Sequence, residues 1–122
     1  MRMLKTIQKT ARLNDVFADD EPGCGGANHA YNVVFRPTHN IDTVMLHLVF
    51  QNGPRDDPES TAGLCDQDLL EIVRDRLKGF SNGELKNRET AIALTHVEEA
   101  LLWLNKRIED RYERGVLGTM EP

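Results

Sequence analysis

The amino-acid sequence predicts an α+β protein, with an N-terminal antiparallel β-sheet followed by a C-terminal antiparallel hairpin of two helices. Residues 1–53 contain short runs in which polar and apolar side chains alternate, which is typical of strands. Residues 66–115 repeat their apolar side chains at every third or fourth position, which is typical of helices. A chain of 122 residues has the size of one domain, so we expect a single domain in which residues 54–65 link the two parts.

Strands are expected in three places. Residues 30–35 are rich in β-forming side chains and stop before Pro37. Residues 43–50 alternate most regularly, and one face is formed by Val44, Leu46, Leu48 and Phe50. Residues 3–17 favour one further strand. Because an isolated β-hairpin is only marginally stable in water, the sheet must pack on something else.

Between the first strands, residues 19–29 form a loop with glycines at positions 23, 25 and 26. Glycine lets the backbone approach a ligand or another chain closely. Turn-forming residues at 51–54 end the preceding strand, and the polar residues that follow form the linker.

The first helix is expected over residues 66–80, with Asp66 as its N-cap. The second is expected over residues 87–114, from Asn87 as N-cap to a stop at Gly115. Its apolar side chains form a near-heptad seam of Leu94, Val97, Leu101, Leu104, Ile108 and Tyr112. The first helix is too short to cover this seam, so the sequence predicts a homo-oligomer.

The composition excludes several classes of function. The net charge of −5 argues against a protein that coats DNA or RNA, and against an anionic membrane surface as partner. No apolar run reaches the roughly 20 residues of a membrane span, and the first residues do not resemble a secretory signal. The two cysteines lack the CxxC spacing of a zinc site. We therefore expect a cytoplasmic protein without a metal or a cofactor.

A second stripe on the long helix carries the strongest candidate chemistry. Its members are His96, Ala100, Trp103, Arg107, Arg111 and Arg114. Arginine presents a planar fork of donors that matches a phosphate, and the neighbouring tryptophan suits an aromatic base. The alternative is a solvated charged face. Likewise, Phe80 is either a stacking residue or the last core residue of its helix, and Arg88 either attracts an anion to the helix start or is simply exposed.

Catalysis has little support in the sequence. Cys24 and His29 invite a nucleophile-and-base interpretation, but no third residue that would orient them is identifiable, and their loop is rich in glycine. The glycines do not form the dinucleotide-binding pattern, and the Walker, HExxH and Gly-x-Ser-x-Gly motifs are missing from the sequence.

Four segments together resemble a known family. They are DEPGCGGANHAYNVV at 20–34, VFQNGP at 49–54, DLLEIVRDRLKGF at 68–80 and RETAIALTHVEEALLWLNKRIEDRYERGVLGT at 88–119. This pattern resembles the type-one Thoeris anti-defence family of phages. The C-terminal hairpin is also similar to that of the phage anti-CBASS cyclic-nucleotide sponges.

The resemblance implies a non-enzymatic sponge that acts in the cytoplasm of the bacterial host. Such proteins bind and sequester cyclic ADP-ribose isomers (glycocyclic ADP-ribose) made by bacterial Thoeris TIR proteins. They form dimers, or hexamers built as trimers of dimers. The hexamers also bind the cyclic di- and trinucleotides of CBASS at separate sites.

The resemblance also implies site residues. Phe80 matches the aromatic residue that contacts the ligand, and Arg107 and Arg111 match the two arginines that grip it. Thr90 replaces the family's usual asparagine, so it keeps a hydroxyl but lacks the amide's paired donor and acceptor. Residues Asn87 and Arg88 are candidates for the second, cyclic-oligonucleotide site.

Two other functions remain open at this point. The first is an enzyme that degrades such a signal and uses Cys24 or His29. The second is a structural or assembly protein of the phage particle.

Overall fold

The computed structural model describes residues 1–8, 14–35 and 44–117. The chain divides into two compact units, Met1–Leu64 and Cys65–Pro122. Strands form the first unit and a pair of helices forms the second, which confirms the predicted α+β class. The predicted strand stop at Pro37 and the start of the predicted strand at Thr43 lie outside the described residues.

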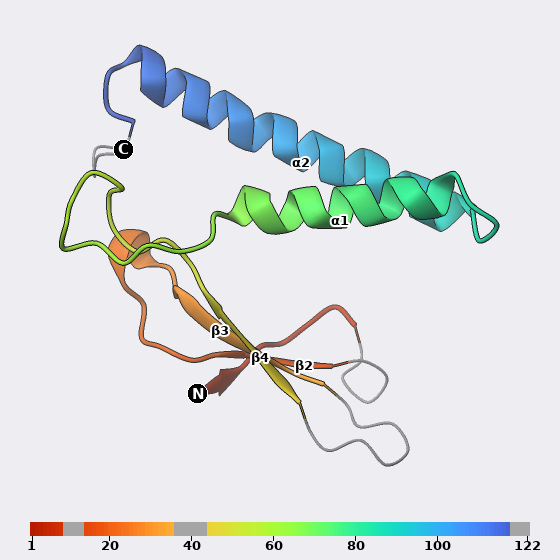
Figure 1. The fold of residues 1–122 in the computed structure, drawn as a ribbon, viewed down its shortest axis with the longest axis horizontal. Coiled ribbons are helices and arrows are strands. Elements are labelled where there is room, and N and C mark those ends of the chain that lie inside the picture. Colours follow the sequence, from red (N-terminus) through yellow and green to blue (C-terminus); the bar gives the residue numbers. More distant parts are fainter. Residues whose placement is uncertain (9–13, 36–43, 118–122) are drawn as a thin grey trace. The chain divides into compact units, whose positions relative to one another are not determined.

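The first unit contains a four-stranded antiparallel sheet in the order β1-β2-β3-β4 (Figure 1). The strands are β1 (Arg2–Met3), β2 (Asp15–Ala18), β3 (Ala30–Val34) and β4 (Met45–Val49). The prediction of a single strand within residues 3–17 is wrong, because Met3 pairs with Phe17 and the chain must reverse between them.

Few side chains of the sheet are buried. Among the residues that the structure describes, Ala18 is the one buried apolar residue, and Asn32 is a buried polar residue with 3% exposure. On β4, Met45 and Leu46 point to opposite faces, yet both are exposed. The sequence of this strand alternates as predicted, but the alternation does not give the strand one buried face and one exposed face.

The segment after β4 folds back on itself. Phe50 pairs with Leu64, and Asn52 pairs with Thr61. A Cβ atom at Gly63 would lie 2.6 Å from the carbonyl carbon of Phe50, so this close approach requires glycine. The residues expected to link the two parts thus form a loop closed by main-chain hydrogen bonds.

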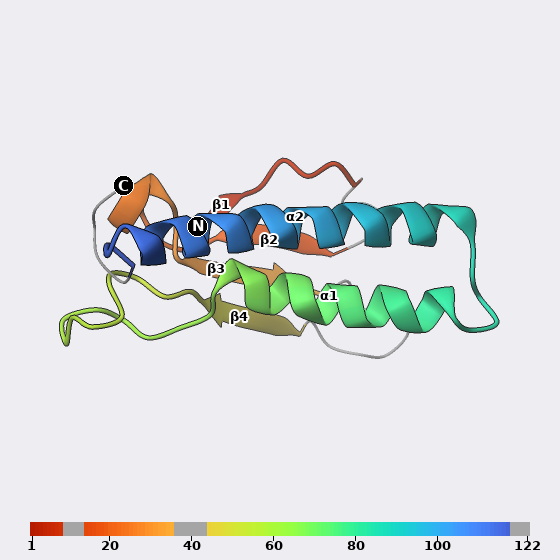
Figure 2. The same ribbon diagram turned by 90° about the horizontal axis from the view of Figure 1, so that it is seen from above.

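The second unit consists of α1 (Asp66–Ser81) and α2 (Arg88–Glu113), which run side by side as an antiparallel hairpin (Figure 2). Arg74 Nε on α1 donates to Glu98 Oε2 on α2 at 2.8 Å. This hydrogen bond with Glu98 raises the pKa of Arg74 above its ordinary value. The pair also fixes which residues of the two helices lie opposite each other.

The helix starts follow the capping rules in different ways. Asn87 caps α2 as predicted, because its Oδ1 accepts from the main-chain N–H of Thr90 at 2.7 Å. The prediction that Asp66 caps α1 is wrong, since Cys65 is the N-cap residue. The carboxylate that accepts a hydrogen bond at the start of α1 is that of Asp68, whose Oδ2 accepts from the main-chain N–H of Cys65 at 2.8 Å.

The two helices leave much of their apolar surface exposed. The exposed large apolar side chains of the two helices are Ile72, Val73, Phe80, Ile92, Leu102, Trp103 and Tyr112. Arg111 is the one buried residue of α1 and α2. Neither helix combines the length and the apolar character that crossing a membrane requires.

Candidate functional site: a basic groove on the second helix

A groove of about 560 Å³ follows the last three turns of α2. It is lined by Trp103, Lys106, Arg107, Asp110, Arg111, Glu113 and Arg114. These residues recur at spacings of three and four, so the helical period brings them to one side of α2. The groove contains the tryptophan and all three arginines of the stripe predicted from the sequence.

The groove is electropositive. Four basic and two acidic side chains line it, which leaves a net charge of +2. Lys106 Nζ is paired with Asp110 Oδ2 at 3.0 Å, one turn further along the helix. Arg107 is exposed and has no hydrogen bond or ion pair with any residue that the structure describes. Its guanidinium is therefore the cation in this groove that remains available to an anionic ligand.

Arg111 also forms a hydrogen bond to the turn that follows α2. It is 8% exposed, and its Nη2 donates to the main-chain oxygen of Val116 at 3.1 Å. The chain can return to Arg111 because Gly115 adopts φ +72°, a left-handed conformation that ends the helix. Arg111 thus contributes to the groove and also holds the turn that follows α2.

The other predicted ligand residues lie at the turn between the helices. Phe80 is in the last turn of α1 and is 41% exposed. The guanidinium carbon of Arg76 lies 5.4 Å from the centroid of its ring, which is a cation–π contact. Thr90 is in the first turn of α2, and its main-chain N–H is bound by the cap residue Asn87. Arg76 was not predicted as a site residue, although its spacing of four from Phe80 was a usable signal.

One chain does not bring all four predicted ligand residues together. Thr90 and Arg107 are separated along α2 by about 17 residues, which is about 25 Å at 1.5 Å per residue. Phe80 lies near the Thr90 end, because the short turn between the helices joins those two ends. Phe80 and Thr90 therefore form one group, and Arg107 and Arg111 form another at the far end of α2.

The two residues predicted for a second site occupy the start of α2. Asn87 uses both ends of its amide, since Oδ1 accepts from Thr90 and Nδ2 donates to the main-chain oxygen of Leu85 at 3.0 Å. Arg88 is the first residue of the helix and is exposed. The positive end of the helix dipole and the Arg88 charge coincide here, which favours an anion.

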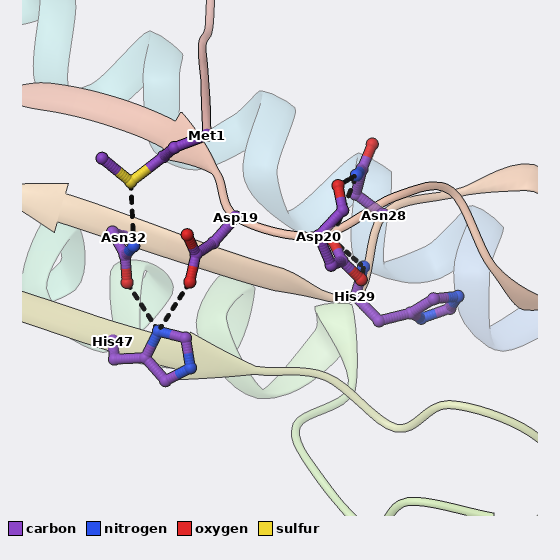
Figure 3. A network of polar contacts seen from close by, with 7 residues as sticks. All are labelled: Met1, Asp19, Asp20, Asn28, His29, Asn32 and His47. Atoms are coloured by element: carbon purple, nitrogen blue, oxygen red, sulfur yellow. Dashed lines mark hydrogen bonds and ion pairs between the residues drawn. The ribbon is translucent and has the colours of Figure 1, made fainter.

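The sheet unit has a separate polar cluster (Figure 3). His47 Nδ1 donates to Oδ1 of the buried Asn32 at 2.5 Å, and it lies 3.9 Å from Asp19 Oδ2. Asn32 Nδ2 in turn contacts the sulfur of Met1 at 3.2 Å. These contacts satisfy a buried amide between two paired strands, which is a structural role.

The loop that carries Cys24 and His29 is held by Asp20. Its carboxylate accepts from the side chain of Asn28 at 3.0 Å and from the main-chain N–H of His29 at 3.0 Å. The hydrogen bond from Asn28, followed by that from His29, lowers the pKa of Asp20. The His29 ring points away from this carboxylate (Figure 3), and its Nε2 donates to the main-chain oxygen of Cys24 at 2.9 Å. That nitrogen carries the proton, so it is not the base in this arrangement.

Two hollows can be compared as sites for an anion. The hollow beside Asp20 has a volume of about 300 Å³ and is also lined by Asp19, Glu21 and Arg2, so its carboxylates repel a phosphate. The groove on α2 is larger and positively charged. Among the described residues, no group of three or more histidine, cysteine or acidic side chains could hold a metal ion.

The sheet followed by a hairpin with an arginine-lined groove defines a helical-hairpin protein suited to a small anionic ligand. Residues 45–109 match the family described as the Acb2/Tad1 hairpin domain, and this protein belongs to that family. The resemblance found in the sequence is thereby confirmed.

A phage protein is also similar to part of this chain. "Thoeris anti-defense 1" of Bacillus phage SBSphiJ7 is 47% identical over 72 residues, which make up 59% of this chain. The chain spans about half the length of this relative.

Proposed function

We propose that this protein is a non-enzymatic anti-defence sponge, which binds and sequesters glycocyclic ADP-ribose made by Thoeris TIR proteins in the cytoplasm of the bacterial host. The observation that carries the proposal is the basic groove on α2, where Arg107 has no partner among the described residues. Membership of the Acb2/Tad1 hairpin family and the similarity to a Thoeris anti-defence protein support it.

The charge of the groove suits this ligand. A cyclic ADP-ribose carries two negative charges on its pyrophosphate, and the groove has a net charge of +2. Arg107 and Arg111 are one helical turn apart, so both guanidinium groups can reach one pyrophosphate. Charge-assisted hydrogen bonds from arginine replace the water that the phosphates lose on binding.

A complete site requires a second copy of the chain. Thr90 is about 25 Å along α2 from Arg107 and about 32 Å from Arg111, and Phe80 lies at the Thr90 end. This span is too long for one small nucleotide. An antiparallel arrangement of two hairpins places Phe80 and Thr90 of one chain beside the arginines of the other. Two-fold symmetry then produces two identical sites.

This arrangement gives the proposed dimer, or a hexamer built as a trimer of dimers, a direct role in binding. It is also consistent with the exposed apolar side chains of Ile72, Val73 and Leu102, which a second chain would cover. In such a site the face of Phe80 stacks on the adenine, and the hydroxyl of Thr90 takes the place of the family's asparagine. Cyclic di- and trinucleotides of CBASS would bind elsewhere, with Arg88 and the start of α2 as the contact and Asn87 as the cap that shapes it.

A sponge must bind its ligand without converting it. The competing function is an enzyme that degrades the signal. A phage structural protein is a weaker competitor, because such a role gives no reason for an arginine-lined groove.

The test is isothermal titration calorimetry with glycocyclic ADP-ribose isomers, followed by heat denaturation of the complex and chromatography of the released ligand. We expect tight binding and full recovery of intact ligand. Recovery of a cleaved product would establish the enzyme instead, and a titration without a heat of binding would favour a structural protein. As a matched check, Cys24→Ser should bind and release the ligand like the parent.

A further inference from the structure

Trp103 lines one end of the groove and is exposed. It is the single tryptophan of the chain, and 65% of its surface is accessible. Its indole N–H has no hydrogen bond, and its ring has no stacking or cation–π contact, with any residue that the structure describes. A tryptophan usually buries its large apolar ring, so this exposure calls for a binding partner.

We propose that Trp103 stacks on the nucleobase of the ligand, on the face opposite to Phe80 of the second chain, and makes the groove selective for a purine nucleotide over a simple phosphate. This inference rests on the proposed function of the groove. Trp103 precedes Arg107 by one helical turn, so an aromatic face and an available guanidinium lie next to each other on one side of α2.

The neighbouring charges support this assignment. Lys106 lies on the same side of the helix, but its charge is paired with Asp110. The available positive charge nearest to Trp103 along α2 is therefore that of Arg107. A base held by the indole and a phosphate held by the guanidinium satisfy both groups with one nucleotide. Inorganic pyrophosphate would satisfy only the arginine.

Acrylamide quenching of the intrinsic fluorescence tests this inference in the full chain, because Trp103 gives the whole tryptophan signal. Saturation with glycocyclic ADP-ribose should protect the indole from acrylamide. Calorimetry should then give a Kd about tenfold weaker for Trp103→Ala, since stacking of a base on an aromatic residue has roughly that effect. Trp103→Phe keeps an aromatic face and should remain within about threefold of the parent.

Tyr112→Ala is the matched control, because Tyr112 is an exposed aromatic residue of the same helix that does not line the groove. It should bind like the parent. The inference is overturned if saturating ligand leaves the quenching of Trp103 by acrylamide unchanged. It is also overturned if Trp103→Ala binds the ligand as tightly as the parent. Trp103 would instead belong to an interface between chains if two results occur together: ligand does not protect the parent's indole from acrylamide, and light scattering shows that Trp103→Ala changes the assembly. Failure of the proposed function is a distinct result, in which the parent itself does not bind glycocyclic ADP-ribose.

Discussion

A site shared between two chains can be tested by complementation. Phe80→Ala removes the stacking group at one end of the hairpin, and Arg107→Ala removes the available cation at the other end. Loss of a stacked aromatic residue corresponds to about 1–3 kcal/mol. Loss of a charge-assisted hydrogen bond corresponds to about 1.5–3 kcal/mol. Each variant alone should therefore bind glycocyclic ADP-ribose at least about tenfold more weakly than the parent.

The mixture of the two variants should behave differently. After joint unfolding and refolding, about half of the dimers contain one chain of each kind. In such a mixed dimer, the intact Phe80 of one chain faces the intact Arg107 of the other, so one of its two sites is complete. About a quarter of all sites should then recover the affinity of the parent.

Calorimetric stoichiometry measures this fraction directly when the concentration of sites is well above the Kd of the parent and below the Kd of the single variants. Neither substitution should change folding, because Phe80 and Arg107 are exposed and alanine is favourable in a helix. A mixture that binds no better than its components would refute the shared site. Parent-like binding by both single variants would show that the ligand binds elsewhere.

Three further predictions concern single residues. Arg111→Ala should weaken ligand binding and also lower the free energy of unfolding by about 1.5–3 kcal/mol, because it removes the hydrogen bond to Val116. Urea denaturation measures this, and the control is Arg107→Ala, because Arg107 has no hydrogen bond or ion pair within the described part of the chain. Asn87→Ala should lower the free energy of unfolding by about 1 kcal/mol through loss of the α2 cap, and a parent-like urea midpoint would contradict this. The lowered pKa of Asp20 adds stability at pH values above 3.8, the ordinary pKa of an aspartate, and this stability is lost as the pH falls through the lower pKa of the folded state. Asp20→Asn should flatten the pH dependence of the free energy of unfolding below pH 3.8.

Much of the helical hairpin could be predicted because its information is local. The period of the apolar side chains and the cap at Asn87 depend on residues within one or two helical turns. The same period placed Trp103 and Arg107 on one side of a helix, and the structure adds that they line a groove. Whether Phe80, Thr90, Arg107, Arg111 and the pair Asn87 and Arg88 bind a ligand stays a prediction.

The features that could not be predicted depend on contacts between distant or short segments. Strand β1 has two residues, which is too few for an alternating pattern to be recognised. It exists because Met3 pairs with Phe17. The hydrogen bond from Arg111 to Val116 depends on the left-handed turn at Gly115, which returns the chain to the helix. The sequence indicated that the helix stops there, but not where the chain goes next.

The proposed division of the site between two chains would have a thermodynamic consequence for binding. A ligand that contacts Phe80 of one chain and Arg107 of the other binds the assembled state more tightly than the separate chains. By linkage, each bound ligand must stabilise the assembly by the same free energy with which assembly strengthens binding. If the site is shared in this way, bound ligand keeps the chains assembled at protein concentrations at which the ligand-free chains would separate.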